Sequence, residues 1–81
     1  MLDLQYSLVI EATEESDFFG FYSPDIIGFS GVGNSIEDCI YKAKYGMKEH
    51  IELLKLTKLP IPPANANPEI IIRNQSLQIS A

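Results

Sequence analysis

The sequence predicts an α+β domain with the element order β-β-β-α-β. Four strands are expected to form one mixed sheet in the order 3-2-1-4, with a single helix on one of its faces. Residues 5–12 alternate between two sets of side chains, as the two faces of a half-buried strand do. Residues 36–56 carry apolar side chains at intervals of three and four, which predicts the helix. Four prolines then separate this helix from a last apolar run at residues 69–73. A chain of 81 residues, 46% of them hydrophobic, has room for one domain with one core, spanning residues 1–81.

The first three strands are expected at residues 5–12, 18–23 and 29–32. A polar break at residues 13–17 joins the first two as an antiparallel hairpin. Pro24 ends the second strand because it has no N–H to donate to a sheet. Glycines on both sides of the third strand allow the chain to turn twice there.

The helix is expected from Ile36 to about Leu56, under a cap formed by Ser35 and Asp38. Its apolar stripe consists of Ile36, Ile40, Ala43, Met47, Ile51 and Leu54. Gly46 is the exception, since glycine costs roughly 1 kcal/mol relative to alanine in a helix unless something packs closely against it.

The prolines of residues 60–68 predict an extended crossing loop that returns the chain to the sheet. The handedness of such crossovers places the last strand parallel to the first. Residues 69–73 are apolar on both sides, as in a strand covered on both faces, for example by a second subunit. Leu77 and Ile79 either add a short terminal strand or fray.

One helix shields only one face of a four-stranded sheet, so the other face is expected to be open in the monomer. It would carry either Phe19 and Phe21 or Phe18 and Tyr22. An open apolar face marks an interface. We therefore expect a homo-oligomer, a dimer or a tetramer, with an interface that includes Ile70, Ile71 and Ile72.

Charge and cysteine content narrow the function classes. Six basic against eleven acidic residues leave a net charge of −5, which disfavours direct nucleic-acid binding and favours a basic protein partner. The chain has one cysteine and therefore no internal disulfide, which suits the cytoplasm. The N-terminus lacks the pattern of a signal peptide, and no apolar run approaches the ~18 residues of a membrane span.

The sequence predicts no catalytic residue, no metal ligand and no cofactor site. Glu11 and Asp25 are conceivable catalytic carboxylates, but Glu11 falls on the strand face opposite Leu8 and Ile10. His50 is the only histidine and has no second metal ligand at a suitable spacing. Cys39 lies beside the helical stripe, so we expect a small, semi-buried apolar side chain rather than a nucleophile.

A set of short motifs, taken in order, resembles the HicB-like antitoxin family. These motifs are Pro24-Asp25-Ile26, Gly28, Gly33, Ser35-Ile36-Glu37-Asp38, Ala43-Lys44 and Pro60-Ile61-Pro62. The sequence departs from the family at Ile27, where proline is common, and at Cys39 and Gly46, where alanine is common. The resemblance implies a truncated ribonuclease H-like domain without that fold's catalytic acids. Only thirteen residues follow Pro68, so no separate DNA-binding domain is expected.

The resemblance also implies a function, which is to neutralise a small basic HicA-type toxin that cleaves mRNA, by covering its RNA site. The residues expected to face this partner are Glu15, Asp17, Tyr22 and Asp25. Two alternatives remain open: an orphan self-assembling domain without a toxin partner, and a metal-dependent nuclease or hydrolase of the ribonuclease H type.

Overall fold

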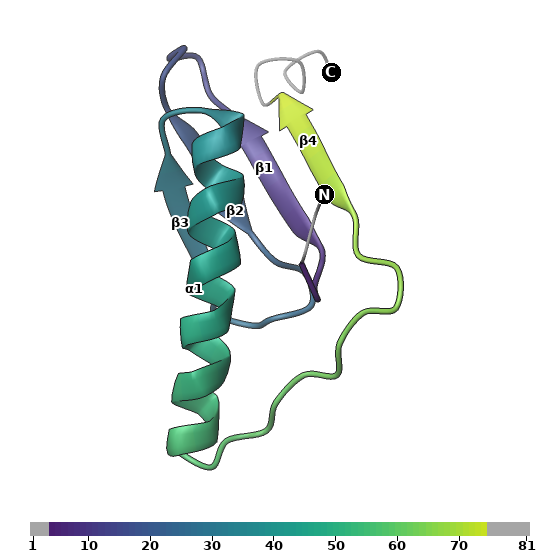
Figure 1. The fold of residues 1–81 in the computed structure, drawn as a ribbon. Coiled ribbons are helices and arrows are strands. Elements are labelled where there is room, and N and C mark those ends of the chain that lie inside the picture. The colour runs from purple at the N-terminus through teal and green to yellow at the C-terminus, as the bar shows by residue number, and fades with distance from the viewer. Residues whose placement is uncertain (1–3, 75–81) are drawn as a thin grey trace.

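A computed structural model describes residues 4–74 and has the predicted architecture (Figure 1). The elements are β1 (Leu8–Ala12), β2 (Phe19–Tyr22), β3 (Ser30–Gly33), α1 (Ile36–Leu56) and β4 (Ile70–Asn74). The strands form one sheet in the order β3-β2-β1-β4, with β2 antiparallel to β1 and β3, and β4 parallel to β1. The predicted α+β fold with strand order 3-2-1-4 is therefore confirmed. Leu77 and Ile79 lie outside the described residues.

The first two strands are shorter than the predicted 5–12 and 18–23, and the third begins and ends one residue later than the predicted 29–32. Before β1, the carbonyl of Gln5 accepts a hydrogen bond from the backbone N–H of Asn65 at 2.8 Å, and the Tyr6 hydroxyl donates to the Pro62 carbonyl at 2.7 Å. Before β3, the N–H of Phe29 closes a turn onto the Ile26 carbonyl at 3.4 Å. The two bonds that Gln5 and Tyr6 make to the crossing loop are long-range, so the local sequence pattern does not predict them.

The helix has the predicted bounds and the predicted cap. The Ser35 hydroxyl accepts the N–H of Asp38 at 3.0 Å, while the Asp38 carboxylate accepts the N–H of Asn34 at 2.9 Å. At the other end, Lys58 adopts a left-handed conformation with φ 59°, and the N–H of Leu59 bonds the Leu54 carbonyl at 2.9 Å. These bonds satisfy backbone groups that a helix terminus leaves without partners.

The core lies between α1 and the sheet face turned toward it. Its buried members are Leu4, Tyr6, Leu8, Ile10, Phe21, Ile26, Phe29, Cys39, Ala43 and Met47, with Ile36, Ile40 and Ile51 packed against them. The predicted helical stripe is thus confirmed except at its last position, Leu54, which is not among the side chains packed against this core. The prediction of a semi-buried Cys39 is wrong, because its side chain is completely buried.

Two glycines explain how the layers approach so closely. A Cβ on Gly46 would lie 3.1 Å from the Phe29 ring, so this helical glycine makes room for a core aromatic residue. A Cβ on Gly33 would lie 2.8 Å from the Cys39 sulfur, so the end of β3 rests directly on the first turn of α1. The close packing that would justify a glycine within the helix is therefore present.

Candidate protein-binding surface

The helix covers the sheet unevenly. It packs mainly against β3 and β2, and β4 lies to one side without a helix over it (Figure 1). The alternation within β2 turns Phe19 and Phe21 toward the core and Tyr22 to the opposite face. Of the two arrangements left open by the sequence, the structure has the one with Tyr22 on the face away from the helix. Phe18 precedes β2 and is 44% exposed.

The sheet face opposite α1, which we call the open face, is defined by strand register. Its members are Val9, Glu11, Gly20, Tyr22, Ser30, Val32, Ile71 and Arg73. Val32 and Ile71 are exposed, while Val9 is buried between its cross-strand neighbours Tyr22 and Ile71. Among residues 4–74 no element covers this face. It is a mixed surface, apolar along its middle and flanked by polar and charged groups.

Strand β4 is an edge strand, and its side chains are open on both faces. Ile71 on the open face and Ile72 on the helix side are 37% and 53% exposed, and Ile70 is half-buried. Within the described residues, β4 pairs with β1 alone. The expected cover on both faces of this strand is therefore absent among residues 4–74, and a subunit interface at β4 stays a prediction.

The outward edge of β4 presents backbone hydrogen-bonding groups. The N–H of Leu8 donates to the Glu69 carbonyl at 2.8 Å, which fixes the direction in which each residue of this segment points. Because alternate residues turn their N–H and C=O to the same side, Glu69 and Ile71 face β1, and Ile70 and Ile72 face outward. An edge of this kind is a template for a further strand.

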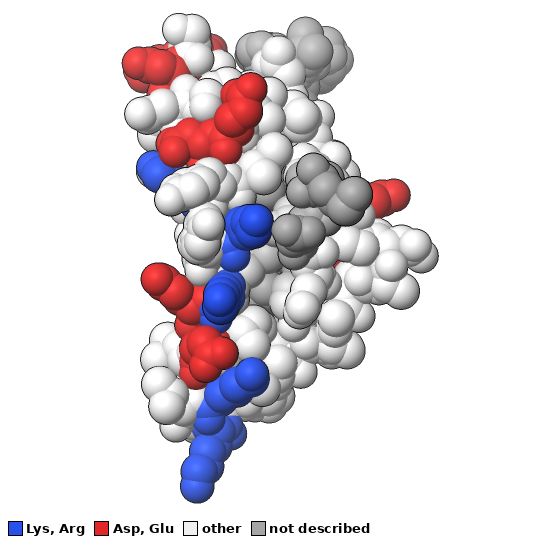
Figure 2. Space-filling view, in the orientation of Figure 1, with Lys and Arg blue, Asp and Glu red and all other residues white. Residues whose placement is uncertain are grey.

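Glu15 and Asp17, two of the predicted partner-facing residues, lie in the exposed loop between β1 and β2. Thr13 shapes this loop, since its hydroxyl donates to the Phe18 carbonyl at 2.8 Å and accepts the N–H of Glu15 at 3.2 Å. With Glu14, these residues form an acidic end of the molecule. Figure 2 shows carboxylates gathered at that end, and along the opposite half of α1 a row of basic side chains with further carboxylates beside it.

Asp25, another predicted partner-facing residue, anchors the backbone. Its carboxylate accepts the N–H of Ser7 at 2.8 Å and the side-chain amide of Asn65 at 3.1 Å. These two bonds hold the pKa of Asp25 below its ordinary value, the Ser7 N–H being the larger cause. The carboxylate thereby joins three segments: the start of β1, the turn after β2 and the crossing loop.

The four predicted partner-facing residues do not form one patch. Glu15 and Asp17 lie at the hairpin end, whereas Tyr22 and Asp25 lie at the other end of β2. At about 3.4 Å per residue, the length of β2 separates the two pairs by about 10 Å. A partner would have to span the open face to contact both.

The residues weighed for catalysis are also placed. Glu11 is on the open face near the hairpin end, far along β1 from Asp25. His50 is half-buried and makes an edge contact with the Phe29 ring at 5.9 Å. Burial raises the pKa of the Cys39 thiol, with a smaller contribution from the charge of Asp38. No group of three or more His, Cys, Asp or Glu side chains within residues 4–74 is placed to share a metal ion.

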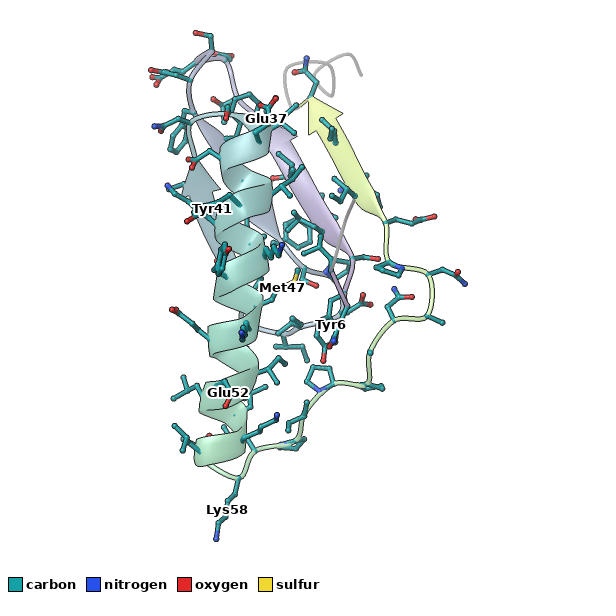
Figure 3. The ribbon with its side chains drawn as sticks, viewed as in Figure 1. Tyr6, Glu37, Tyr41, Met47, Glu52 and Lys58 are labelled. Carbon is teal, nitrogen blue, oxygen red and sulfur yellow. The ribbon has the colours of Figure 1, made fainter. Side chains whose placement is uncertain are left out.

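One feature was not expected from the sequence: a cavity of about 300 Å³ between α1 and residues 4–6. Figure 3 shows Met47 and Tyr6, which line it from the helix and from the N-terminal segment respectively. Lys44, Lys48 and Lys55 of α1 also line this cavity, and their spacing along the helix was the one sign of it in the sequence. The sequence could not show that residues 4–6 would pack across from them.

Comparisons with protein-family models, with curated proteins and with solved structures found no match to this chain. Within residues 4–74, no helix has both the length and the apolar character needed to cross a membrane.

Proposed function

We propose that this chain is a cytoplasmic, non-catalytic binding domain of the HicB-like antitoxin type, with a truncated ribonuclease H-like fold. It would neutralise a small basic HicA-type toxin by covering the toxin's RNA site. The observation that carries the proposal is the half-covered sheet: a single helix shields one face, and the open face leaves Val32 and Ile71 exposed. A surface of this kind fits a protein partner.

The residues that carry the family resemblance support the proposal at the level of the fold. Pro24 follows the last residue of β2, and Asp25 anchors the start of β1. Gly28 has a φ of 86°, a value that few other residues adopt, and Ser35 caps α1. These are structural roles. The residues that contact a partner are therefore to be sought on the open face and at the acidic end.

The charge distribution supports a basic partner. The exposed hairpin loop contributes Glu14, Glu15 and Asp17, and this part of the molecule carries no lysine. Opposite charge across an interface speeds encounter and rejects partners of like charge. A basic RNA-cleaving protein is attracted by an acidic surface that RNA itself avoids.

The outward edge of β4 supports self-association. We expect two copies to pair through β4 in antiparallel register about a two-fold axis, which would extend the sheet and cover Ile72 of each copy. Ile72→Pro would remove an outward N–H and none of the N–H groups that bond β1, so the monomer fold should persist. Ile72→Val, the matched control, keeps that N–H.

Sedimentation analysis tests this pairing. We expect the parent chain and Ile72→Val to be dimers or tetramers and Ile72→Pro to be monomeric at the same concentration, with unchanged far-ultraviolet circular dichroism. An oligomer that is indifferent to Ile72→Pro would place the contact elsewhere. A parent chain that is monomeric at every concentration would remove self-association from the proposal.

An inhibition assay tests the antitoxin function. Purified HicA-type toxin is incubated with RNA and increasing amounts of this protein, and we expect cleavage to stop near equimolar addition. Glu15→Lys should weaken inhibition about tenfold. Glu49→Lys makes the same charge change on the exposed side of α1 and should not. Equal effects of the two variants would remove the acidic end from the interface.

The same assay contains the decisive control. The protein alone is incubated with RNA and Mn²⁺, and no cleavage is expected. Cleavage that a single carboxylate substitution abolishes would replace the proposal with the nuclease alternative. No inhibition of any HicA-type toxin, combined with stable self-association, would favour the orphan assembly domain.

A further inference from the structure

The side of α1 that faces away from the sheet carries several large apolar side chains. These are Tyr41, Tyr45, Leu53 and Leu56, which are between 50% and 80% exposed. No other element of residues 4–74 lies over this side of the helix (Figure 1). Single exposed apolar residues are common on protein surfaces, but several on one side of a helix form a patch of the kind that marks an interface.

A shallow groove of about 480 Å³ runs over this patch. Every residue that lines it belongs to α1, and the six are Tyr45, Lys48, Glu49, Glu52, Leu53 and Leu56. The groove is therefore a hollow between the side-chain ridges of a single helix. Hollows of this kind receive the ridges of a second helix, at an axis separation of about 8–10 Å. The shape of the groove thus fits a helical partner.

The order of side chains along the patch makes it complementary to a reversed copy of itself. Tyr41 and Tyr45 form its first part, with ring centres 4.9 Å apart, and Leu56 lies at its end. Charged side chains lie between them, and Figure 2 shows acidic and basic groups next to one another along this part of α1. An antiparallel second helix would place the aromatic part against the leucine and the charged part against its own reverse. A two-fold interface requires this self-complementarity, because both copies present the same surface.

Lys48 and Glu52 supply the charge complementarity. Lys48 is exposed and makes no hydrogen bond or ion pair with any residue from 4 to 74. One Glu52 oxygen lies 3.8 Å from the Lys55 ammonium group, and a carboxylate can accept from a second donor through its other oxygen. With a two-fold axis level with residue 50, each Lys48 lies opposite Glu52 of the other copy. Each Tyr45 then lies opposite Leu56 of the other copy, so charged groups and apolar groups are matched in one register.

We propose that this side of α1 binds α1 of a second copy of the chain, with the two helices antiparallel about that axis. The contact is separate from the open face and from the outward edge of β4, and it does not depend on the antitoxin function. It extends over about 17 Å of one helix, the rise from Tyr45 to Leu56, so it is smaller than a standard interface and correspondingly weak. It therefore forms at higher protein concentrations than strand pairing through β4, and Ile72→Pro remains monomeric in dilute solution.

Sedimentation equilibrium at protein concentrations up to about 1 mM tests the contact, the range in which a small interface is measurable. We expect the mean mass of the parent chain to rise with concentration by one further association step, whatever state it reaches through β4. Lys48→Glu and Glu52→Lys should each weaken this step by about tenfold, because each change places two pairs of like charges across the axis. The double variant exchanges the two charges and restores both pairs, so it should associate within about threefold of the parent.

Lys58→Glu is the control for net charge. Lys58 follows α1, does not line the groove and points away from the rest of the molecule (Figure 3), so this variant should change the association by less than about twofold. All three substituted side chains are exposed, so the variants should fold, which circular dichroism checks. The absence of a further association step in the parent would overturn the proposal. So would single variants that associate as Lys58→Glu does, or a double variant as weak as the single ones. Because β4 is the same in all of these proteins, the result does not depend on strand pairing.

Discussion

The contact between Gly31 and Phe21 gives the sharpest test of the packing described above. The two residues are cross-strand partners in β3 and β2, and the Phe21 ring lies over the glycine. A Cβ on residue 31 would lie 2.5 Å from Cζ of that ring and about 3 Å from its two Cε atoms. Carbon atoms in contact normally keep about 3.5–4.0 Å, so Gly31→Ala would displace the ring by about 1 Å.

The ring has little room to move. Phe21 is 6% exposed, and its ring centre lies 6.0 Å from that of Phe29. Overpacking of a core of this kind costs about 1–3 kcal/mol, while alanine gains about 0.5–1 kcal/mol over glycine in a strand. Gly31→Ala should therefore lower the free energy of unfolding by about 1–2 kcal/mol.

Gly20→Ala is the matched control within the same sheet. The nearest atom to its added Cβ would be the Gly31 carbonyl oxygen at 4.0 Å, so only the backbone gain applies, about 0.5–1 kcal/mol. Urea unfolding followed by circular dichroism should separate the two variants by about 2 kcal/mol, or roughly 10 °C in melting temperature. If Gly31→Ala were as stable as Gly20→Ala, the close contact with Phe21 would be refuted.

Three further predictions concern other core and loop contacts. Gly46→Ala should change the free energy of unfolding by less than about 0.5 kcal/mol in the parent chain, but raise it by about 1 kcal/mol in a Phe29→Leu background. Equal effects in the two backgrounds would contradict the explanation that Gly46 makes room for the Phe29 ring. Asp25→Asn should cost about 1 kcal/mol at pH 7. Folding lowers the pKa of Asp25 from 3.8, so its contribution to stability is complete above that pH and is lost as pH falls through the lowered pKa. The difference in stability between Asp25→Asn and the parent chain should therefore shrink below about pH 4 in urea titrations. A constant difference down to about pH 2 would argue against the anchor. Cys39 should react with a thiol reagent only through unfolding, at rates that rise with urea, and rapid labelling without denaturant would show that it is not enclosed.

The sequence predicted the features that depend on short-range patterns. The helix bounds followed from the cap at Ser35 and from the spacing of its apolar residues, and both are seen in the structure. The strand order followed from the hairpin and from the handedness of the crossover, which are rules of chain geometry. None of these inferences required knowledge of a specific tertiary contact.

The features that were missed depend on distant segments. Strand β1 begins late because Gln5 and Tyr6 bond to the crossing loop. Cys39 is completely buried because Gly33 allows β3 to approach the helix. The role of Asp25 as an anchor required Ser7 and Asn65 to meet it from two other parts of the chain. The candidate surface was anticipated in kind, since an open face was expected, but its residues came only from the strand register.

The placement of β4 has a consequence for the order in which the protein forms. Ser7, just before β1, and Glu69, just before β4, are joined by a hydrogen bond across 62 residues of sequence. The hairpin, β3 and α1 have nearer neighbours in sequence and can therefore assemble before β4 docks. Until β4 arrives, β1 is itself the bare border of a three-stranded nascent sheet. The β4 strand of another copy could pair with β1 first, so this topology is prone to domain swapping through β4.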